Sequence, residues 1–79
     1  MIQMPSMTRW TVEVSGRPRT HYDNMMDALT AASHALYMGP DTYRAATNAL
    51  RNGRTFDFAY GFTDATIYPP GKLVGNRND

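Results

Sequence analysis

The sequence contains no cysteine, which excludes disulfide bonds and thiolate metal sites as sources of stability for a short chain. It has two histidines, His21 and His34, and we expect no metal site because zinc needs three or four converging ligands. No apolar run approaches the roughly 18–20 residues of a membrane span. The start, MIQMPSMTRW, lacks the basic and apolar regions of a signal peptide. We therefore expect a cytoplasmic protein that contacts no membrane.

Charge of either sign is also scarce. Eight Lys and Arg residues oppose seven Asp and Glu residues, and a net charge of +1 is too small to drive non-specific nucleic-acid binding by itself. The cations are all arginine except Lys72. Arginine binds carboxylates and phosphates through a planar fork, which suits interfaces, although a GC-rich genome would produce the same bias.

Arrangements typical of catalysis are missing. Ser6, Ser15 and Ser33 do not belong to a His/Asp arrangement of the nucleophilic type. The acidic residues are scattered, and no glycine-rich phosphate loop is present. We therefore expect no enzymatic activity and no cofactor.

A chain of 79 residues is long enough for one domain. The first clear pattern along the chain is that of a β-strand. Trp10, Val12 and Val14 alternate with polar residues, as in a strand with one buried face. The turn residues SGRP and the short segment RTHY then predict a hairpin.

Two helices follow. Asp23 and Asn24 are candidate N-caps for a helix that runs to about Met38, and Asn24 with Asp27 resembles a capping box. Gly39 is the expected residue just past its C-terminus. Asp41 or Thr42 is the expected cap of a second helix, which ends at Asn52-Gly53. The inner faces are expected to carry Met25, Met26, Leu29, Ala32, Ser33 and Leu36 in the first helix, and Tyr43, Ala46, Thr47 and Leu50 in the second.

The segment RTFDFAYGFT, residues 54–63, places Phe56, Phe58 and Tyr60 on one face of a strand. Such aromatic residues stack bases in RNA-recognition sheets, and Arg54, Phe56 and Phe58 match that pattern. However, Asp57 would bring a negative charge near phosphates, and a second helix precedes the segment where that fold has a strand. We therefore interpret the aromatic face as part of the core, followed by a turn around GFTD and a strand ATIYP.

The resulting order of elements is strand, short strand, helix, helix, strand, strand. It predicts an α+β fold with an antiparallel sheet of three or four strands and both helices on one face. Residues 1–7 and 71–79 are expected to be loose termini. The predicted core contains Trp10, Val12, Leu29, Leu36, Leu50, Phe56, Phe58 and Ile67.

Arginines are the best candidates for an interaction site. Arg17 and Arg19 lie at the predicted hairpin tip, Arg51 and Arg54 flank the end of the second helix, and Arg44 lies two turns before that end. Arg51 also complements the helix dipole, so it has a structural explanation as well. Guanidinium groups on a rigid turn suit a phosphate or an acidic protein surface.

In size and plan the chain resembles the small inhibitors that phages and mobile elements encode, anti-CRISPR proteins above all. The segments that carry this resemblance are RWTVEV, DNMMDALTAASHAL and RTFDFAYGFTDATIY. It implies a protein that binds a host protein complex, in particular a CRISPR effector complex, and blocks it sterically. Separately, a small sheet with one open face and exposed edges is a candidate for self-pairing, so we expect a monomer or a homodimer. Many such inhibitors are acidic DNA mimics, whereas this chain carries a net charge of +1, so the expected contact is an acidic protein surface or bound nucleic acid. The alternatives are a small nucleic-acid-binding module that uses the five arginines, and a structural or regulatory subunit.

Overall fold

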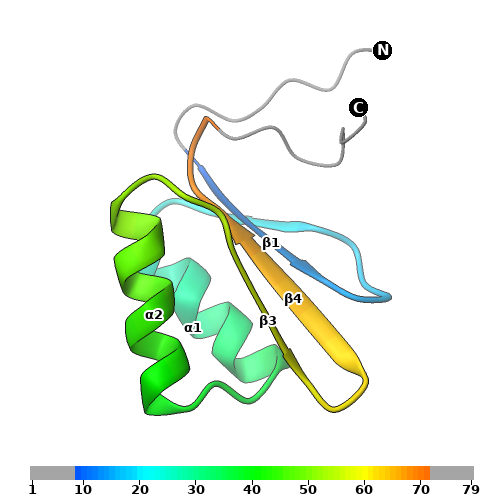
Figure 1. Ribbon diagram of the computed structural model, residues 1–79. Helices are drawn as coiled ribbons and strands as arrows, with labels where there is room; N and C mark the ends of the chain where they lie inside the picture. Colours follow the sequence, from blue (N-terminus) through cyan, green and yellow to red (C-terminus); the bar gives the residue numbers. More distant parts are fainter. Residues whose placement is uncertain (1–8, 72–79) are drawn as a thin grey trace.

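The computed structural model describes residues 9–71 (Figure 1). Apart from Gly71, the termini that were expected to be loose lie outside these residues. The predicted α+β class and order are confirmed. Neither helix in the described range has the length and apolar character of a membrane span. The elements are β1 (Trp10–Val14), β2 (Thr20–Tyr22), α1 (Met25–Ala35), α2 (Pro40–Arg51), β3 (Phe56–Tyr60) and β4 (Thr63–Tyr68).

The four strands form one antiparallel sheet in the order β2-β1-β4-β3. The central strands β1 and β4 come from opposite ends of the described chain, and Val12 of β1 lies opposite Ile67 of β4. Both helices cover the same face of the sheet (Figure 1). The helix α1 packs on β1, β2 and β4, whereas α2 lies against β3. Among residues 9–71, no helix covers the opposite face of the sheet.

The core lies between the sheet and the helices. It consists of Val12, Val14, Ala28, Leu29, Ala32, Leu36, Ala46, Leu50, Ala65 and Ile67. Trp10, Phe56 and Phe58 are partly buried against it, so the predicted core residues are all found in or beside this cluster. Alanines on both helices keep their inner faces small, which allows the helices to approach the larger side chains of the sheet.

The helix α1 begins as predicted. Asn24 is its N-cap, and Oδ1 of Asn24 accepts a 2.8 Å hydrogen bond from the backbone N–H of Asp27. The helix ends at Ala35 rather than near Met38, because Leu36 takes an extended conformation (φ −149°, ψ 133°). This change of direction places Leu36 in the core. The prediction for Met26 is wrong, since its side chain is 55% exposed and Ala28 lies inside instead.

The start of α2 also differs from the prediction. Gly39 does not end α1 but serves as the N-cap of α2, and Pro40 is the first helical residue. Proline favours this position because its ring fixes a helical φ and its missing N–H would have no partner there. The expected caps, Asp41 and Thr42, lie inside the helix. The end of α2 is as predicted, with Asn52 as C-cap and Gly53 at φ +74°.

The segment RTFDFAYGFT forms β3 and its turn. Phe56 lies opposite Ile67 and Phe58 lies opposite Ala65, and both rings pack against the core. The two rings stack with centroids 6.0 Å apart. Tyr60 differs from the prediction, because its side chain is 60% exposed at the end of the strand. Two of the three aromatic residues therefore belong to the core, and the third lies on the surface.

Candidate interaction surface

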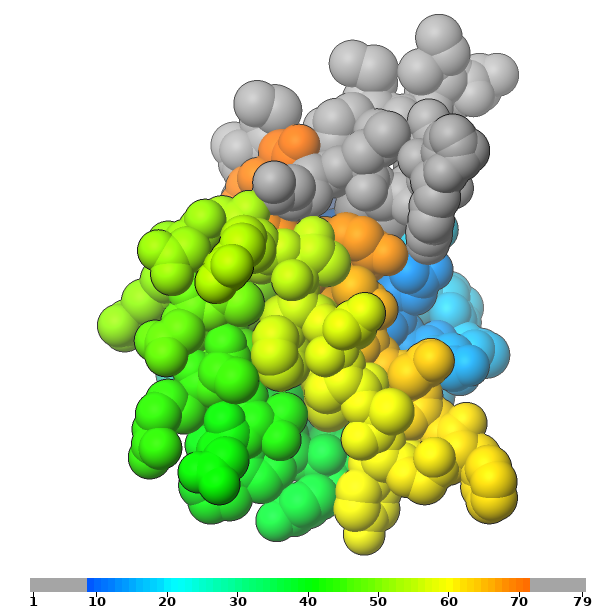
Figure 2. Space-filling view, viewed as in Figure 1, coloured from blue at the N-terminus to red at the C-terminus, as the bar shows by residue number. Residues whose placement is uncertain are grey.

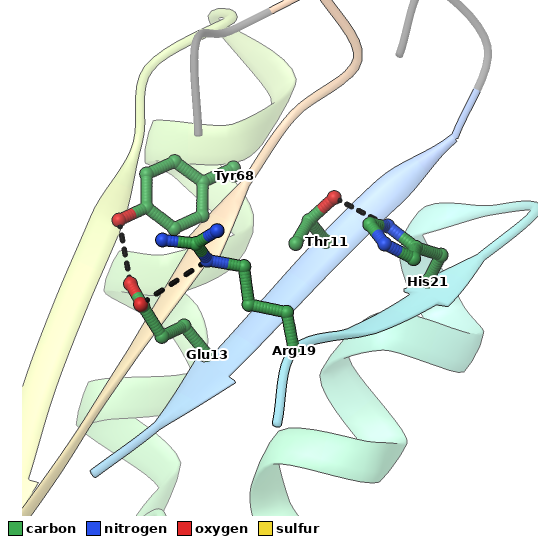
Figure 3. Close-up of polar contacts among 5 residues, drawn as sticks. All are labelled: Thr11, Glu13, Arg19, His21 and Tyr68. Carbon is green, nitrogen blue, oxygen red and sulfur yellow. Dashed lines mark hydrogen bonds and ion pairs between the residues drawn. The ribbon is translucent and has the colours of Figure 1, made fainter. Parts of the chain in front are cut away.

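The face of the sheet without helices carries a network of polar side chains (Figure 3). Glu13 of β1 is at its centre. Its Oε2 accepts a 3.2 Å hydrogen bond from Nε of Arg19, and its Oε1 accepts a 2.9 Å hydrogen bond from the hydroxyl of Tyr68. One carboxylate thus connects the segment before β2 with β4, across β1.

A second polar contact lies beside this network (Figure 3). Thr11 Oγ1 and His21 Nδ1 are 2.9 Å apart and share a hydrogen bond. A hydroxyl next to an imidazole can be an activated nucleophile, but Thr11 is only 2% exposed and offers no access to a substrate. No buried side-chain N or O atom of the described residues lacks a hydrogen-bond partner. This pair therefore stabilises the pairing of β1 with β2.

The described part of the chain contains no group of side chains that could bind a metal ion. Within residues 9–71, no three His, Cys, Asp or Glu side chains gather where they could hold a metal ion. His21 is engaged with Thr11, and His34 is exposed on α1. The two histidines lie on different elements, a strand and a helix.

The five predicted arginines do not form one surface. Arg19 is paired with Glu13, and Arg17 lies in the turn between β1 and β2. Arg44 and Arg51 lie on α2, and Arg54 lies between α2 and β3. Because β2 and β3 are the two opposite edges of the sheet, the arginines fall into two groups on opposite sides of the molecule.

A shallow groove follows α2, and we call it the α2 groove. Its volume is about 610 Å³. It is lined by Met38, Pro40, Tyr43, Arg44, Thr47, Asn48 and Arg51. The guanidinium of Arg44 lies 3.6 Å from the carboxylate of Asp41, and both side chains are largely exposed. Arg51 makes no side-chain hydrogen bond or ion pair within the described residues.

Three exposed aromatic residues lie on the α1–α2 connection, at the end of β3 and in the β3–β4 turn, and we call them the aromatic cluster: Tyr37, Tyr60 and Phe62. Tyr37 is 63% exposed and Phe62 is fully exposed. The rings of Tyr37 and Tyr60 are in contact, with centroids 5.3 Å apart and an angle of 55° between their planes. The tip of the β3–β4 hairpin, coloured yellow, protrudes from the body of the molecule (Figure 2).

Backbone geometry holds the aromatic cluster in place. Tyr60 pairs with Thr63, so the loop between them has two residues, Gly61 and Phe62. Gly61 has φ +66°, whereas Phe62 does not have a positive φ, which is the pattern of a type II′ turn. This turn matches the twist of the strands and leaves the ring of Phe62 in solvent. A rigid, two-residue tip therefore presents an aromatic side chain with little freedom to retract.

Tyr37 is positioned by its neighbours in the connection between the helices. A Cβ atom at Gly39 would lie 3.4 Å from the hydroxyl oxygen of Tyr37, so the ring lies close over the backbone of Gly39. Its other neighbour is the ring of Tyr60. The α1–α2 connection and the β3–β4 turn lie at the same end of the molecule (Figure 1).

Sequence reasoning missed the aromatic cluster. Gly61-Phe62 between two alternating segments is a two-residue hairpin signal, and it would have placed Phe62 at an exposed position. Tyr60 lies on the same face of the strand as Phe56 and Phe58, so alternation alone predicted that it would be buried as well. Nothing in the sequence brings Tyr37 to Tyr60, since they lie on different elements.

Comparison of the chain with models of protein families, with curated proteins and with solved structures finds no match. The function is therefore inferred from the chain's own residues and their arrangement.

Proposed function

We propose that this chain is a non-enzymatic interaction protein that binds a host protein complex and blocks it sterically. A phage- or mobile-element-encoded inhibitor of a CRISPR effector complex is the specific form of this proposal, because the sequence resembles such inhibitors in size and plan. The observation that carries the proposal is the aromatic cluster, since its three exposed aromatic residues lie on the α1–α2 connection, at the end of β3 and in the β3–β4 turn.

Exposed aromatic residues indicate a protein partner for a physical reason. Leaving large rings in water is unfavourable, and contiguous exposed apolar patches usually mark binding sites. Aromatic side chains are enriched among the residues that dominate interface energies, because a rigid ring buries a large area at a small cost in entropy. Phe62 has the geometry of such an anchor, since it protrudes from the tip of a tight turn.

Direct nucleic-acid binding by all five arginines, the alternative from the sequence, has less support. Arg19 is neutralised by Glu13, and the remaining arginines lie near opposite edges of the sheet. Asp57 and Asp64 add negative charge to the helix-free face of β3 and β4. A nucleic-acid backbone that contacted all five arginines would have to wrap around the domain.

The proposal can be tested in bacterial strains that carry active CRISPR systems of different types. We expect the chain to restore plating of a targeted phage in at least one of them. Tyr60→Ala together with Phe62→Ala should abolish this effect, because the variant removes the anchor and leaves the core intact. The matched control is Met26→Ala, which also removes an exposed apolar side chain but lies on α1, and it should retain the effect.

Three further measurements complete the test. Circular dichroism should give the same melting temperature for the double variant as for the original chain, which separates binding from folding. His21→Gln with His34→Gln should keep the inhibition, because the proposal gives no imidazole a catalytic role. The proposal would be wrong if the aromatic variant inhibited fully. It would also be wrong if the isolated chain bound DNA or RNA tightly in a gel shift, with a steep salt dependence and no protein partner.

A further inference from the structure

The α2 groove has a charge pattern of its own. Arg44, Asn48 and Arg51 are spaced by four and three residues, so they share one face of the helix. At a rise of about 1.5 Å per residue, Arg44 and Arg51 lie about 10 Å apart along the axis. The inner face of the same helix carries the buried residues Ala46 and Leu50. Arg44 and Arg51, which we call the arginine row, therefore point away from the core.

Apolar side chains line the groove beside this row. Met38 and Pro40 lie at its N-terminal end, and Tyr43 follows one turn later. Tyr43 is partly buried against the core, and its hydroxyl donates a 3.8 Å hydrogen bond to the sulfur of Met26. Its carbonyl accepts a 2.9 Å hydrogen bond from the Thr47 hydroxyl. The groove therefore combines a fixed apolar strip with a parallel row of positive charge.

We propose that the α2 groove binds an amphipathic acidic helix of the partner protein. Carboxylates seven residues apart on a helix lie on one face at the same spacing as Arg44 and Arg51. A helix that lies along α2 can therefore pair with both guanidinium groups while its apolar stripe covers Met38 and Tyr43. This inference rests on the proposed function, because it names the kind of surface that the partner presents.

Charge complementarity favours a helix over a nucleic-acid backbone at this site. Asp41 lies 3.6 Å from Arg44 at the border of the groove, so one negative group adjoins the two positive ones. A nucleic acid carries closely spaced charges, about one per 1.7 Å of duplex, and would place some of them against Asp41. A helix can place carboxylates only opposite the two arginines, and it supplies the apolar side chains that the strip requires.

The groove begins near the aromatic cluster. Met38 directly follows Tyr37 in the chain, and α2 starts at the end of the molecule where the β3–β4 turn lies (Figure 1). One partner surface can therefore contact Phe62 at the tip and extend along α2. The aromatic cluster would anchor the complex, and the arginine row would select the partner by its charge.

The test uses a synthetic amphipathic helical peptide of about 20 residues with leucines on one face and two glutamates seven positions apart beside them. The control peptide has the same composition, with one glutamate moved to the opposite face. Fluorescence anisotropy should show that the first peptide binds the full chain at least about tenfold more tightly than the second. Backbone amide signals in NMR spectra should shift along α2 and not along β2.

Charge variants then locate the site. Arg51→Glu should weaken binding about tenfold or more, whereas Arg17→Glu, which changes the net charge equally on the other side of the sheet, should not. A peptide with lysines in place of the two glutamates should restore binding to the variant Arg44→Glu with Arg51→Glu. Equal binding of both peptides, or equal effects of the two single variants, would overturn the inference.

The two proposals can fail separately. If the aromatic double variant loses inhibition while Arg51→Glu keeps both inhibition and peptide binding, the acidic helix is wrong and the proposed function stands. If a single-stranded oligonucleotide binds through Arg51 more tightly than the glutamate peptide, the groove is a phosphate site and the inference is wrong. If peptide binding follows Arg51 but no strain shows inhibition, the groove is supported and the proposed function is not.

Discussion

The hydroxyl of Tyr68 donates a 2.9 Å hydrogen bond to Oε1 of Glu13, which joins residues 55 positions apart in the sequence. Glu13 is partly buried and also accepts a hydrogen bond from Nε of Arg19. Removing its carboxylate therefore leaves the Tyr68 hydroxyl and the Arg19 guanidinium without this acceptor. We predict that Glu13→Ala lowers the free energy of unfolding by about 1–3 kcal/mol and Tyr68→Phe by about 0.5–1.5 kcal/mol. Urea denaturation measures both, and the double variant should lose less than the sum. Additive losses would show that the bond contributes no coupling.

The two hairpin arginines should behave differently. Arg17→Glu should leave stability unchanged, because Arg17 makes no side-chain hydrogen bond or ion pair within the described residues. Arg19→Glu should cost about 1–2 kcal/mol, since it removes a partly exposed ion pair with Glu13 and places a second carboxylate beside it. Thermal melts at low and high salt should show the difference narrowing as salt screens the repulsion. Equal melting temperatures at low salt would contradict this placement of Arg19.

Phe58 and Phe62 form a matched pair, since both are phenylalanines in the same hairpin. Phe58 packs against the core and Phe62 is fully exposed. Phe58→Ala should lower the free energy of unfolding by about 2–3 kcal/mol, less than the roughly 3–5 kcal/mol for a fully buried ring. Phe62→Ala should change it by less than about 0.5 kcal/mol. Guanidinium denaturation of the two variants checks this, and a destabilising Phe62→Ala would indicate that the ring packs against the domain.

The N-cap of α1 gives a local test of the fold. Asn24→Ala removes the 2.8 Å hydrogen bond to the backbone N–H of Asp27, and should cost about 1 kcal/mol. Asn24→Asp keeps an acceptor at this position and adds a favourable charge at the helix N-terminus. It also replaces the 3.2 Å hydrogen bond from Nδ2 of Asn24 to Oδ2 of Asp27 with a contact between two carboxylates, so it should lose less stability than Asn24→Ala without gaining any. Differential scanning calorimetry of the two variants measures the contrast. Identical losses would mean that the side-chain amide, rather than the acceptor oxygen, is what matters.

Patterns within single elements were readable from the sequence. The alternation around Val12 predicts β1, and the Asn24 cap predicts the start of α1, because both depend on residues a few positions apart. The segregation of strands and helices then predicts the α+β class, and the structure confirms it. In the same way, the alternation of side chains along β3 predicts that Phe56 and Phe58 pack against the core.

Relationships between elements were decided only by the tertiary structure. The end of α1 lies three residues before the predicted one because burying Leu36 in the core favours an extended residue there. The contact of Tyr37 with Tyr60 requires the α1–α2 connection and β3 to meet in space, and no spacing in the sequence encodes it. The pairing of Arg19, one of the predicted interaction residues, with Glu13 likewise depends on how β1 and the segment before β2 meet in space. Local periodicity determines which face of a strand or helix is buried, whereas the exposure of a particular side chain depends on what the rest of the chain packs against it.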